Sequence, residues 1–269
     1  MTFRSVLLAL LFGAWAFGVQ AETMRLAVTT SFHNSGLADV LLPQIKQDTG
    51  LDVQLLVVGT GQALRLGRAG DVDAILVHSK AAEEAFVAEG YGTHRREIMY
   101  NDFVLIGPER DPADLSSADT AQAAFKRIAD AKPVFVSRGD DSGTHRRELA
   151  LWAAAGVDVT AASPDWYRAA GAGMGATLNT AVGMAAYVLS DRATWLKFGN
   201  KADLDILFEG DPALFNQYAY LPVSPDRHPH VAHDKAAALE AWLTGPVGQS
   251  LIAEYQISGT QLFVPNAGN

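Results

Sequence analysis

The residues with the clearest chemical potential form one run, Ser137-Arg138-Gly139-Asp140-Asp141-Ser142-Gly143-Thr144-His145. It follows a short apolar segment at 134–136 and precedes a helical pattern at 146–155. Glycines and hydroxyl residues at a helix start allow backbone N–H groups to converge on an anion, and Arg138 adds a permanent positive charge on a planar fork of donors. The run predicts an oxyanion cradle. The alternative is an ordinary turn in which Arg138 pairs with Asp140 or Asp141.

Further turns of the chain have the same glycine and hydroxyl composition and also precede helical patterns. They are Thr30-Ser31, Thr60-Gly61 and the glycine-rich stretch before Thr177. None of them matches a phosphate-binding P-loop or a dinucleotide fingerprint. The carboxyl ends of parallel strands meet at one edge of a sheet, where ligands bind, so the prediction of an anion site rests on these turns occurring together.

Short apolar runs alternate with helical patterns along the chain, which is typical of α/β layers. Strands are expected at 25–29, 53–58, 74–77 and 134–136, and hinge strands at 101–107 and 217–223. The sequence predicts two lobes, each a mostly parallel sheet flanked by helices, with a ligand cleft between them. One wall of the cleft is expected to carry Thr30, Ser31 and Thr60, and the other Arg138, Ser142 and Thr177.

The N-terminal segment 1–21 has the features of a secretory signal peptide. Arg4 precedes an apolar run at 6–19, and Val19-Gln20-Ala21 supplies small residues at the cleavage positions. The hinge strands then divide the remaining chain. Lobe I is expected to comprise 22–103 and the returning segment 221–269, which carries two C-terminal helices, and lobe II to comprise 104–220.

Composition limits the possible partners and the compartment. The formal net charge is −9, which argues against nucleic acid or an anionic membrane surface as a partner, although it leaves a small anion possible in a locally positive pocket. The chain has no cysteine, so it has neither disulfides nor thiolate metal ligands. An exported chain without cysteine indicates a soluble protein of the periplasm.

Two other chemistries compete with anion binding. Asp140, Ser142 and His145 are residue types of a nucleophilic triad and would make the chain a hydrolase, but His145 lies within the same helical turn as Ser142. His228, His230 and His233 have a spacing that can bind a metal such as zinc, although their polar, proline-rich surroundings favour a surface loop.

The order of these blocks resembles the tungstate-binding periplasmic proteins of ABC importers, of the TupA type. The resemblance extends over nearly the whole chain after the signal segment and rests on these stretches: Thr29-Thr30-Ser31, Asn34-Ser35-Gly36-Leu37, Val58-Gly59-Thr60-Gly61-Gln62-Ala63-Leu64, Gly70-Asp71-Val72-Asp73, Val77-His78, Met99-Tyr100-Asn101-Asp102-Phe103, the run 137–145 and Gly173-Met174-Gly175.

The resemblance implies a type II periplasmic binding protein that performs no catalysis. It implies a monomer that holds tungstate without metal or cofactor and delivers it to a permease and an ATPase. By position, the residues expected to bind the ligand are Thr30, Ser31, Thr60, Gly61, Arg138, Ser142, Gly143, Thr144 and Thr177.

The chain departs from the family pattern at two positions. Val28 and Phe32 stand where relatives usually have further threonines. If the hydroxyl at position 32 normally contacts the ligand, that hydrogen bond is missing here, while a backbone N–H would remain. Molybdate therefore stays an alternative ligand. Phosphate also stays open, because Asp140 or Asp141 can accept the proton of hydrogen phosphate, unless these aspartates instead orient Arg138.

Overall fold

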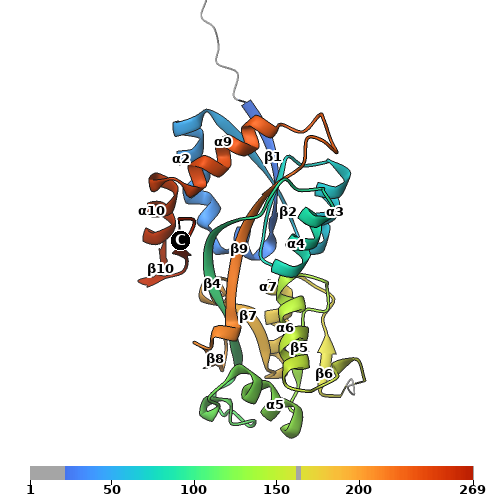
Figure 1. Cartoon of the computed structure of the whole chain (residues 1–269). Coiled ribbons are helices and arrows are strands. Elements are labelled where there is room, and N and C mark those ends of the chain that lie inside the picture. The colour runs from blue at the N-terminus through green and yellow to red at the C-terminus, as the bar shows by residue number, and fades with distance from the viewer. Residues whose placement is uncertain (1–21, 162–164, 269) are drawn as a thin grey trace, which may run out of the picture.

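The computed structural model describes residues 22–161 and 165–268, so the predicted signal peptide at 1–21 lies outside the described residues. The chain forms two lobes joined by long strands (Figure 1). In lobe I, β1 (Glu22–Thr29) pairs in parallel with β2 (Leu51–Val58) and β3 (Ala74–Val77). The strands expected at 25–29, 53–58 and 74–77 are confirmed.

Alternation along β1 explains why helices cover both faces of this sheet. Leu26 and Val28 pack in one core with α2 (Leu37–Thr49) and α9 (His233–Thr244), whereas Ala27 packs in a second core with α3 (Thr60–Ala69) and α4 (Lys80–Ala88). A strand that is buried on both faces reads as a continuous apolar run. The remaining elements of this lobe are α1 (Thr30–Ser35), α10 (Pro246–Glu254), β10 (Gln256–Ile257), β11 (Thr260–Gln261) and β12 (Val264–Pro265).

The two predicted hinge strands are β4 (Arg96–Pro108) and β9 (Phe215–Pro222). They pair antiparallel with each other, and β9 also pairs antiparallel with β3. Beyond Asp102, β4 leaves β9 and pairs with the strands of lobe II, so a single strand belongs to both lobes. The sheets are therefore mixed rather than mostly parallel. The sequence pattern located these strands but did not reveal their direction.

Lobe II is built on the second half of β4. It pairs antiparallel with β7 (Val188–Asp191) and β8 (Leu204–Phe208), while β5 (Phe135–Ser137) and β6 (Tyr167–Ala169) form a short parallel pair. The helices of this lobe are α5 (Ala121–Ala131), α6 (Gly143–Ala154) and α7 (Met174–Met184). Short 3-10 turns occur at Leu115–Ser117, Val159–Ala161 and Pro212–Leu214.

Helix α8 (Arg192–Lys197) follows β7 in sequence but packs on α1 of lobe I. Its Ala193 is fully buried in the core that contains α2 and α9. Gly36 lies beside this contact with left-handed backbone (φ +79°), and a Cβ there would be 2.2 Å from Lys197 Nζ and 2.8 Å from Tyr255 OH. The two lobes are therefore tied by a helix as well as by strands.

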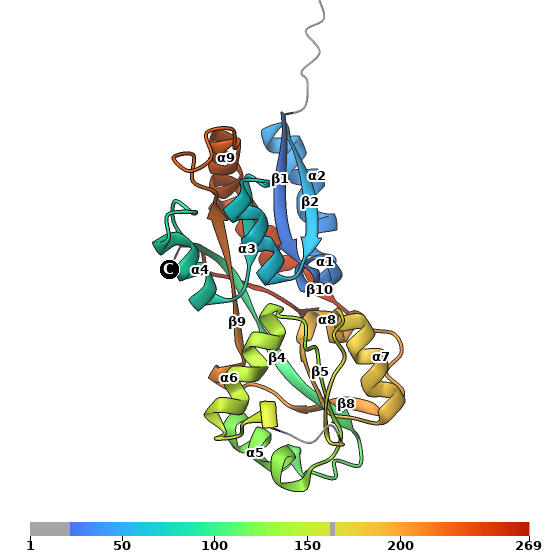
Figure 2. The same cartoon turned by 90° about the vertical axis from the view of Figure 1, so that its right-hand side faces the viewer.

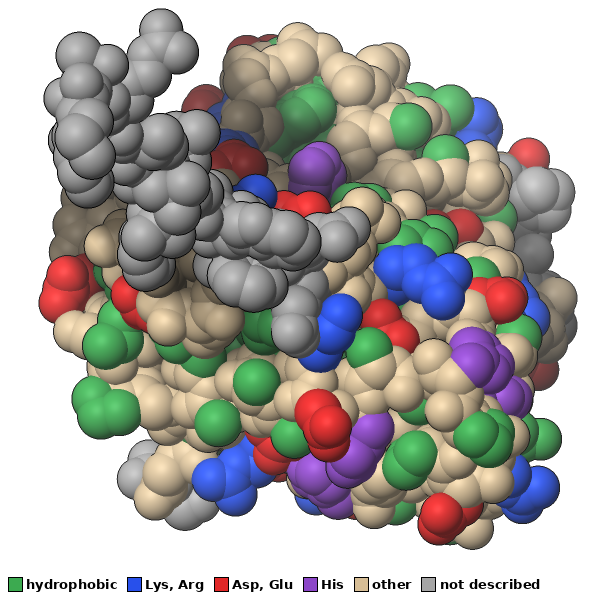
Figure 3. Space-filling view, turned by 90° about the horizontal axis from the view of Figure 1, so that it is seen from above, with side chains coloured by type: hydrophobic (Ala, Val, Ile, Leu, Met, Phe, Trp, Pro, Cys, Tyr) green, Lys and Arg blue, Asp and Glu red, His purple; other side chains and the backbone are tan. Residues whose placement is uncertain are grey.

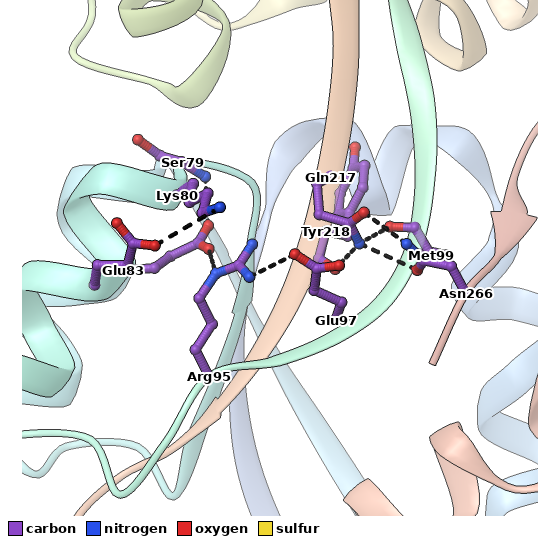
Figure 4. Close-up of polar contacts among 10 residues, drawn as sticks. Ser79, Lys80, Glu83, Arg95, Glu97, Met99, Gln217, Tyr218 and Asn266 are labelled. Carbon is purple, nitrogen blue, oxygen red and sulfur yellow. Dashed lines mark hydrogen bonds and ion pairs between the residues drawn. The ribbon is translucent and has the colours of Figure 1, made fainter. Parts of the chain in front are cut away.

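A polar network holds β4 and β9 together (Figure 4). The side-chain amide of Gln217 donates to the carbonyl oxygens of Met99 at 2.9 Å and Tyr218 at 3.0 Å, and it exchanges hydrogen bonds with the amide of Asn266. These contacts lie beside the irregularity in the β4 and β9 register between Glu97 and Met99, so they fix the pairing where the regular ladder is interrupted.

Arg95, just before β4, links this region to α4. Its guanidinium contacts Glu83 and Glu97, each at 2.7 Å, and Glu83 also accepts the backbone N–H of Ser79. The start of α4 is thereby held against the strand. Among the described residues, no helix is both long and apolar enough to cross a membrane.

Candidate functional site

Helix α6 begins earlier than the sequence pattern indicated, at Gly143 rather than Arg146. The turn before it contains left-handed backbone at Gly139 (φ +62°) and Asp141 (φ +58°). The Ser142 hydroxyl caps the helix by accepting a hydrogen bond from the His145 N–H at 3.2 Å. Gly143 and Thr144 therefore lie in the first turn, where backbone N–H groups have no partner within the helix.

Arg138 lies next to this turn and is 3% exposed. Its Nη2 donates to Asp140 Oδ2 at 2.5 Å, and Asp140 Oδ1 accepts the Ser142 N–H at 3.2 Å. Burial raises the pKa of Asp140, but the hydrogen bonds from Arg138 and Ser142 outweigh burial. The net pKa is therefore lowered, and this carboxylate is ionised. Asp140 therefore orients Arg138, which was the alternative in the sequence analysis to accepting a proton from hydrogen phosphate. The pairing leaves Arg138 Nε buried and without a partner in the described structure.

The facing wall comes from lobe I, at the end of β1. Ser31 Oγ lies 2.9 Å from Thr29 Oγ1, 3.0 Å from His78 Nε2 and 3.2 Å from Tyr218 OH. Thr30 is half-buried as the first residue of α1. The Phe32 side chain is buried in the core, and its backbone N–H donates to Thr29 Oγ1. That N–H therefore takes part in capping α1.

Two glycines allow the lobes to touch at this point. A side chain at Gly143 would meet His78 Nδ1 at 2.7 Å and Thr60 Oγ1 at 3.1 Å. A side chain at Gly61 would meet Asp141 Oδ2 at 2.5 Å. Gly61 belongs to lobe I and Asp141 to lobe II, so the lobes approach closely here, and a side chain at Gly143 would press on the buried ring of His78.

His78 is buried between these walls. Burial, and then the positive charge of Arg138, lowers the pKa of its imidazole to about 3. The ring is therefore neutral at physiological pH and adds hydrogen-bonding capacity without charge. Its Nε2 contacts Ser31, while its Nδ1 is buried with no partner among the described residues.

Unpartnered polar atoms gather in this part of the molecule. They come from both lobes and from the two crossing strands, and within the described ranges they are Thr60 Oγ1, His78 Nδ1, Asn101 Nδ2, Arg138 Nε, Thr144 Oγ1, Asp191 Oδ2, Thr194 Oγ1 and Asn216 Oδ1. An unsatisfied buried donor or acceptor costs roughly 1–3 kcal/mol. Such a concentration in a native fold indicates a polar guest that completes the hydrogen bonds.

Several of these residues escaped the sequence analysis. Asn101 on β4 and Asn216 on β9 stand opposite each other, and the Asn216 amide donates to Asn101 Oδ1 at 2.7 Å. Asp191 ends β7, where burial raises its pKa despite the hydrogen bond from the Thr194 N–H and the charge of Arg138. His78 and Asn101 lie in stretches that carry the family resemblance, and His78 also directly follows a buried strand.

Thr177 differs from the other predicted site residues. Its hydroxyl lies 3.2 Å from the carbonyl oxygen of Ala172 and 3.1 Å from that of Gly173, and it can donate to either. Its proton is therefore engaged in fastening the start of α7 to the preceding turn. The structure thus brings the Ser31, Thr60 and Ser142–Thr144 turns close together, whereas the contacts of the Thr177 hydroxyl are with the turn before its own helix.

The competing chemistries find no support in the geometry. His145 Nδ1 accepts the backbone N–H of Asp141 at 3.1 Å, so that nitrogen is not available as a base for Ser142. His228 and His230 each contact a backbone carbonyl oxygen at 2.9 Å, those of Arg68 and Gly70. Among the described residues, no group of three or more His, Asp or Glu side chains is arranged to hold a metal ion.

Comparison with known proteins agrees with the two-lobed fold. A PBP superfamily domain matches residues 19–247. The chain is 48% identical over 246 residues to the tungstate-binding protein TupA of Peptoclostridium acidaminophilum, covering 90% of this chain and 85% of that protein.

Solved structures give the same result. The tungstate-binding protein TupA from Desulfovibrio alaskensis G20 has a TM-score of 0.78 at 44% identity, covering 92% of this chain and 100% of that one. The tungstate ABC transporter structure from Geobacter sulfurreducens has a TM-score of 0.79 at 47% identity, covering 87% and 99%. The expectation of a binding protein rather than an enzyme is confirmed. The chain therefore belongs to the PBP superfamily and, within it, to the TupA family of solute-binding proteins.

Proposed function

We propose that the chain binds tungstate and delivers it to the permease and ATPase of an ABC importer. Its relatives bear the name of tungstate-binding proteins. It acts as a monomer in the periplasm after removal of the signal peptide 1–21. Lobe I, comprising 22–103 and 221–269, and lobe II, comprising 104–220, enclose the ligand between them.

One observation carries the proposal: buried donors without protein partners, namely the hydroxyls of Thr60 and Thr144 and Nε of Arg138, come from both lobes. The ligand contacts Arg138 and hydroxyl or backbone N–H groups of Thr30, Ser31, Thr60, Ser142 and Thr144. Gly61 and Gly143 contribute by allowing the close approach of the lobes. Thr177 supports the site from the start of α7.

The chemistry suits a fully deprotonated dianion. Tungstate requires only donors, and the site supplies a guanidinium, hydroxyls and helix-start N–H groups. Each hydrogen bond to a charged group contributes roughly 1.5–3 kcal/mol, so several together support tight binding after the costs of ordering are subtracted. Molybdate has the same charge and shape and is the closest competitor.

A thermal-shift panel with tungstate, molybdate, sulfate, phosphate and chromate tests the function. A ligand at 100 times its dissociation constant stabilises the folded state by about 2.7 kcal/mol, which corresponds to about 5–10 °C for a chain of this size. Tungstate is expected to give the largest shift. If none of the anions raises the melting temperature, oxyanion binding is wrong. If phosphate gives the largest shift, tungstate is wrong.

A further inference from the structure

Residues at the start of α4 in lobe I and in α6 of lobe II line a groove of about 660 Å³. Figure 2 shows these two helices close to each other where the lobes meet. Its walls include His78 and Gly143, which also belong to the candidate site. The groove therefore reaches the site from outside. Its volume is far larger than a tetrahedral oxyanion requires, so it is not itself the binding cavity.

A second hollow of about 260 Å³ continues this groove toward α3. The two share Ala82 and Arg146 as lining residues, and the second adds Arg65 and Arg68. The two hollows adjoin at these shared residues, and together we call them the α4/α6 groove; it lies at the junction of the lobes and has His78 among its lining residues.

The charge of the α4/α6 groove is opposite to that of the whole protein. Five cations line it: Lys80, Arg146, Arg147, Arg65 and Arg68. Three carboxylates stand against them: Glu84 in the groove wall, Asp141 paired with Arg146 and Glu89 paired with Arg68. The difference is a net charge of +2, whereas the chain as a whole carries −9. The face in Figure 3, by contrast, shows basic and acidic side chains interspersed.

Arg147 is the cation whose situation points most directly to an anion. It is half-buried, and its Nη2 donates to the backbone carbonyl oxygen of Phe215 at 2.9 Å. Burial lowers the pKa of its guanidinium, and no ion pair from a carboxylate offsets this within the described part of the chain. The charge of Arg147 also acts on His78 in the site. A partly desolvated cation without a counter-ion attracts an anion more strongly than a solvated one does.

We propose that the α4/α6 groove is the path by which the dianionic ligand approaches the site, and that its excess positive charge accelerates capture. This inference rests on the proposed function. Because the rest of the protein repels anions, a local positive channel raises the concentration of the ligand where the lobes meet. The groove acts on the association rate. The contacts around Arg138 set the dissociation rate.

Stopped-flow kinetics of tungstate binding, followed by tryptophan fluorescence, tests the inference. The variant Lys80→Glu/Arg65→Glu reverses two exposed cations of the groove that make no contact with the site residues. At about 10 mM ionic strength, where the screening length is about 30 Å, its association rate constant is expected to fall roughly fivefold. At about 1 M the difference should largely disappear. The dissociation rate constant should stay the same.

The matched control is Lys46→Glu/Lys126→Glu, which changes the net charge by the same amount on exposed helices outside the groove. Equal association rates for the groove and control variants would overturn the inference, as would a loss that persists at high salt. If the unmodified protein binds no oxyanion, the proposed function fails, and this inference fails with it. If the unmodified protein binds tungstate and the groove variant binds it with the same association rate constant, only this inference is wrong.

Discussion

Helix α6 carries two buried polar residues one turn apart, and they differ in what surrounds them. Thr144 and Glu148 are each 1% exposed. The Thr144 hydroxyl has no partner in the described structure. Glu148 Oε1, in contrast, accepts hydrogen bonds from Trp152 Nε1 at 3.2 Å and from the Tyr167 hydroxyl at 2.8 Å.

The difference shows that burial of a polar group does not by itself mark a binding site. Around Glu148 the protein supplies the donors, so the cluster is complete and holds α6 against β6. The Thr144 hydroxyl remains unused, and the unused groups of Thr60 and His78 lie across the junction of the lobes from the neighbouring Gly143. The number of missing partners, rather than the burial, separates a site prepared for a ligand from a structural cluster.

Removing Arg138 should have the largest effect on binding. Arg138→Ala deletes the buried charge at the centre of the unsatisfied cluster, and truncating such a charge partner costs roughly 2–5 kcal/mol. We expect the dissociation constant for tungstate, measured by calorimetric titration, to rise about a thousandfold, which equals about 4 kcal/mol.

Arg127→Ala is the control, because it removes a half-exposed cation of lobe II that pairs with Asp114 away from the site. Its affinity should match that of the unmodified protein. If Arg138→Ala bound tungstate equally well, Arg138 would not belong to the site.

The Glu148 cluster, in which the protein supplies the hydrogen-bond donors, should make the free energy of unfolding depend on pH rather than change ligand affinity. Burial raises the pKa of Glu148 to about 7, well above its value of 4.5 in an unfolded chain. Between these values the folded state binds more protons, so this group loses stabilising free energy as the pH rises toward and through 7. Glu148→Gln stays neutral, and its free energy of unfolding relative to the unmodified protein should therefore rise by about 2 kcal/mol between pH 5 and pH 8.

Urea unfolding at the two pH values measures this change. The exposed Glu84→Gln variant is the control and should show no such difference. If the difference in free energy of unfolding between Glu148→Gln and the unmodified protein were the same at both pH values, Glu148 would have an ordinary pKa and water would reach the cluster.

Deleting one unsatisfied hydroxyl should give the smallest effect and the most specific one. Thr144→Val keeps the shape and removes a group that has no protein partner. Tungstate affinity should fall roughly tenfold, because one hydrogen bond to a charged ligand is lost. The stability without ligand should stay the same or rise slightly, since no internal bond is broken. Loss of stability without ligand would show that Thr144 has a structural partner.

The sequence predicted the turns of the site better than the strands that cross it. Glycine and hydroxyl residues at Thr60 and at 142–144 have local signatures, because helix starts require them. Asn101 and Asn216 have none, since each is a single polar residue in a strand and becomes informative only when the register places the two opposite each other. The antiparallel direction of β4 and β9 likewise depends on pairing between residues that are distant in the chain.

Strand β4 is continuous through both sheets, with an irregular register on each side of the junction. No loop of low stability intervenes there. A change in the angle between the lobes therefore bends a hydrogen-bonded strand, and the two irregular positions are where it bends most easily. Repeated binding and release of the ligand therefore need no local unfolding of β4.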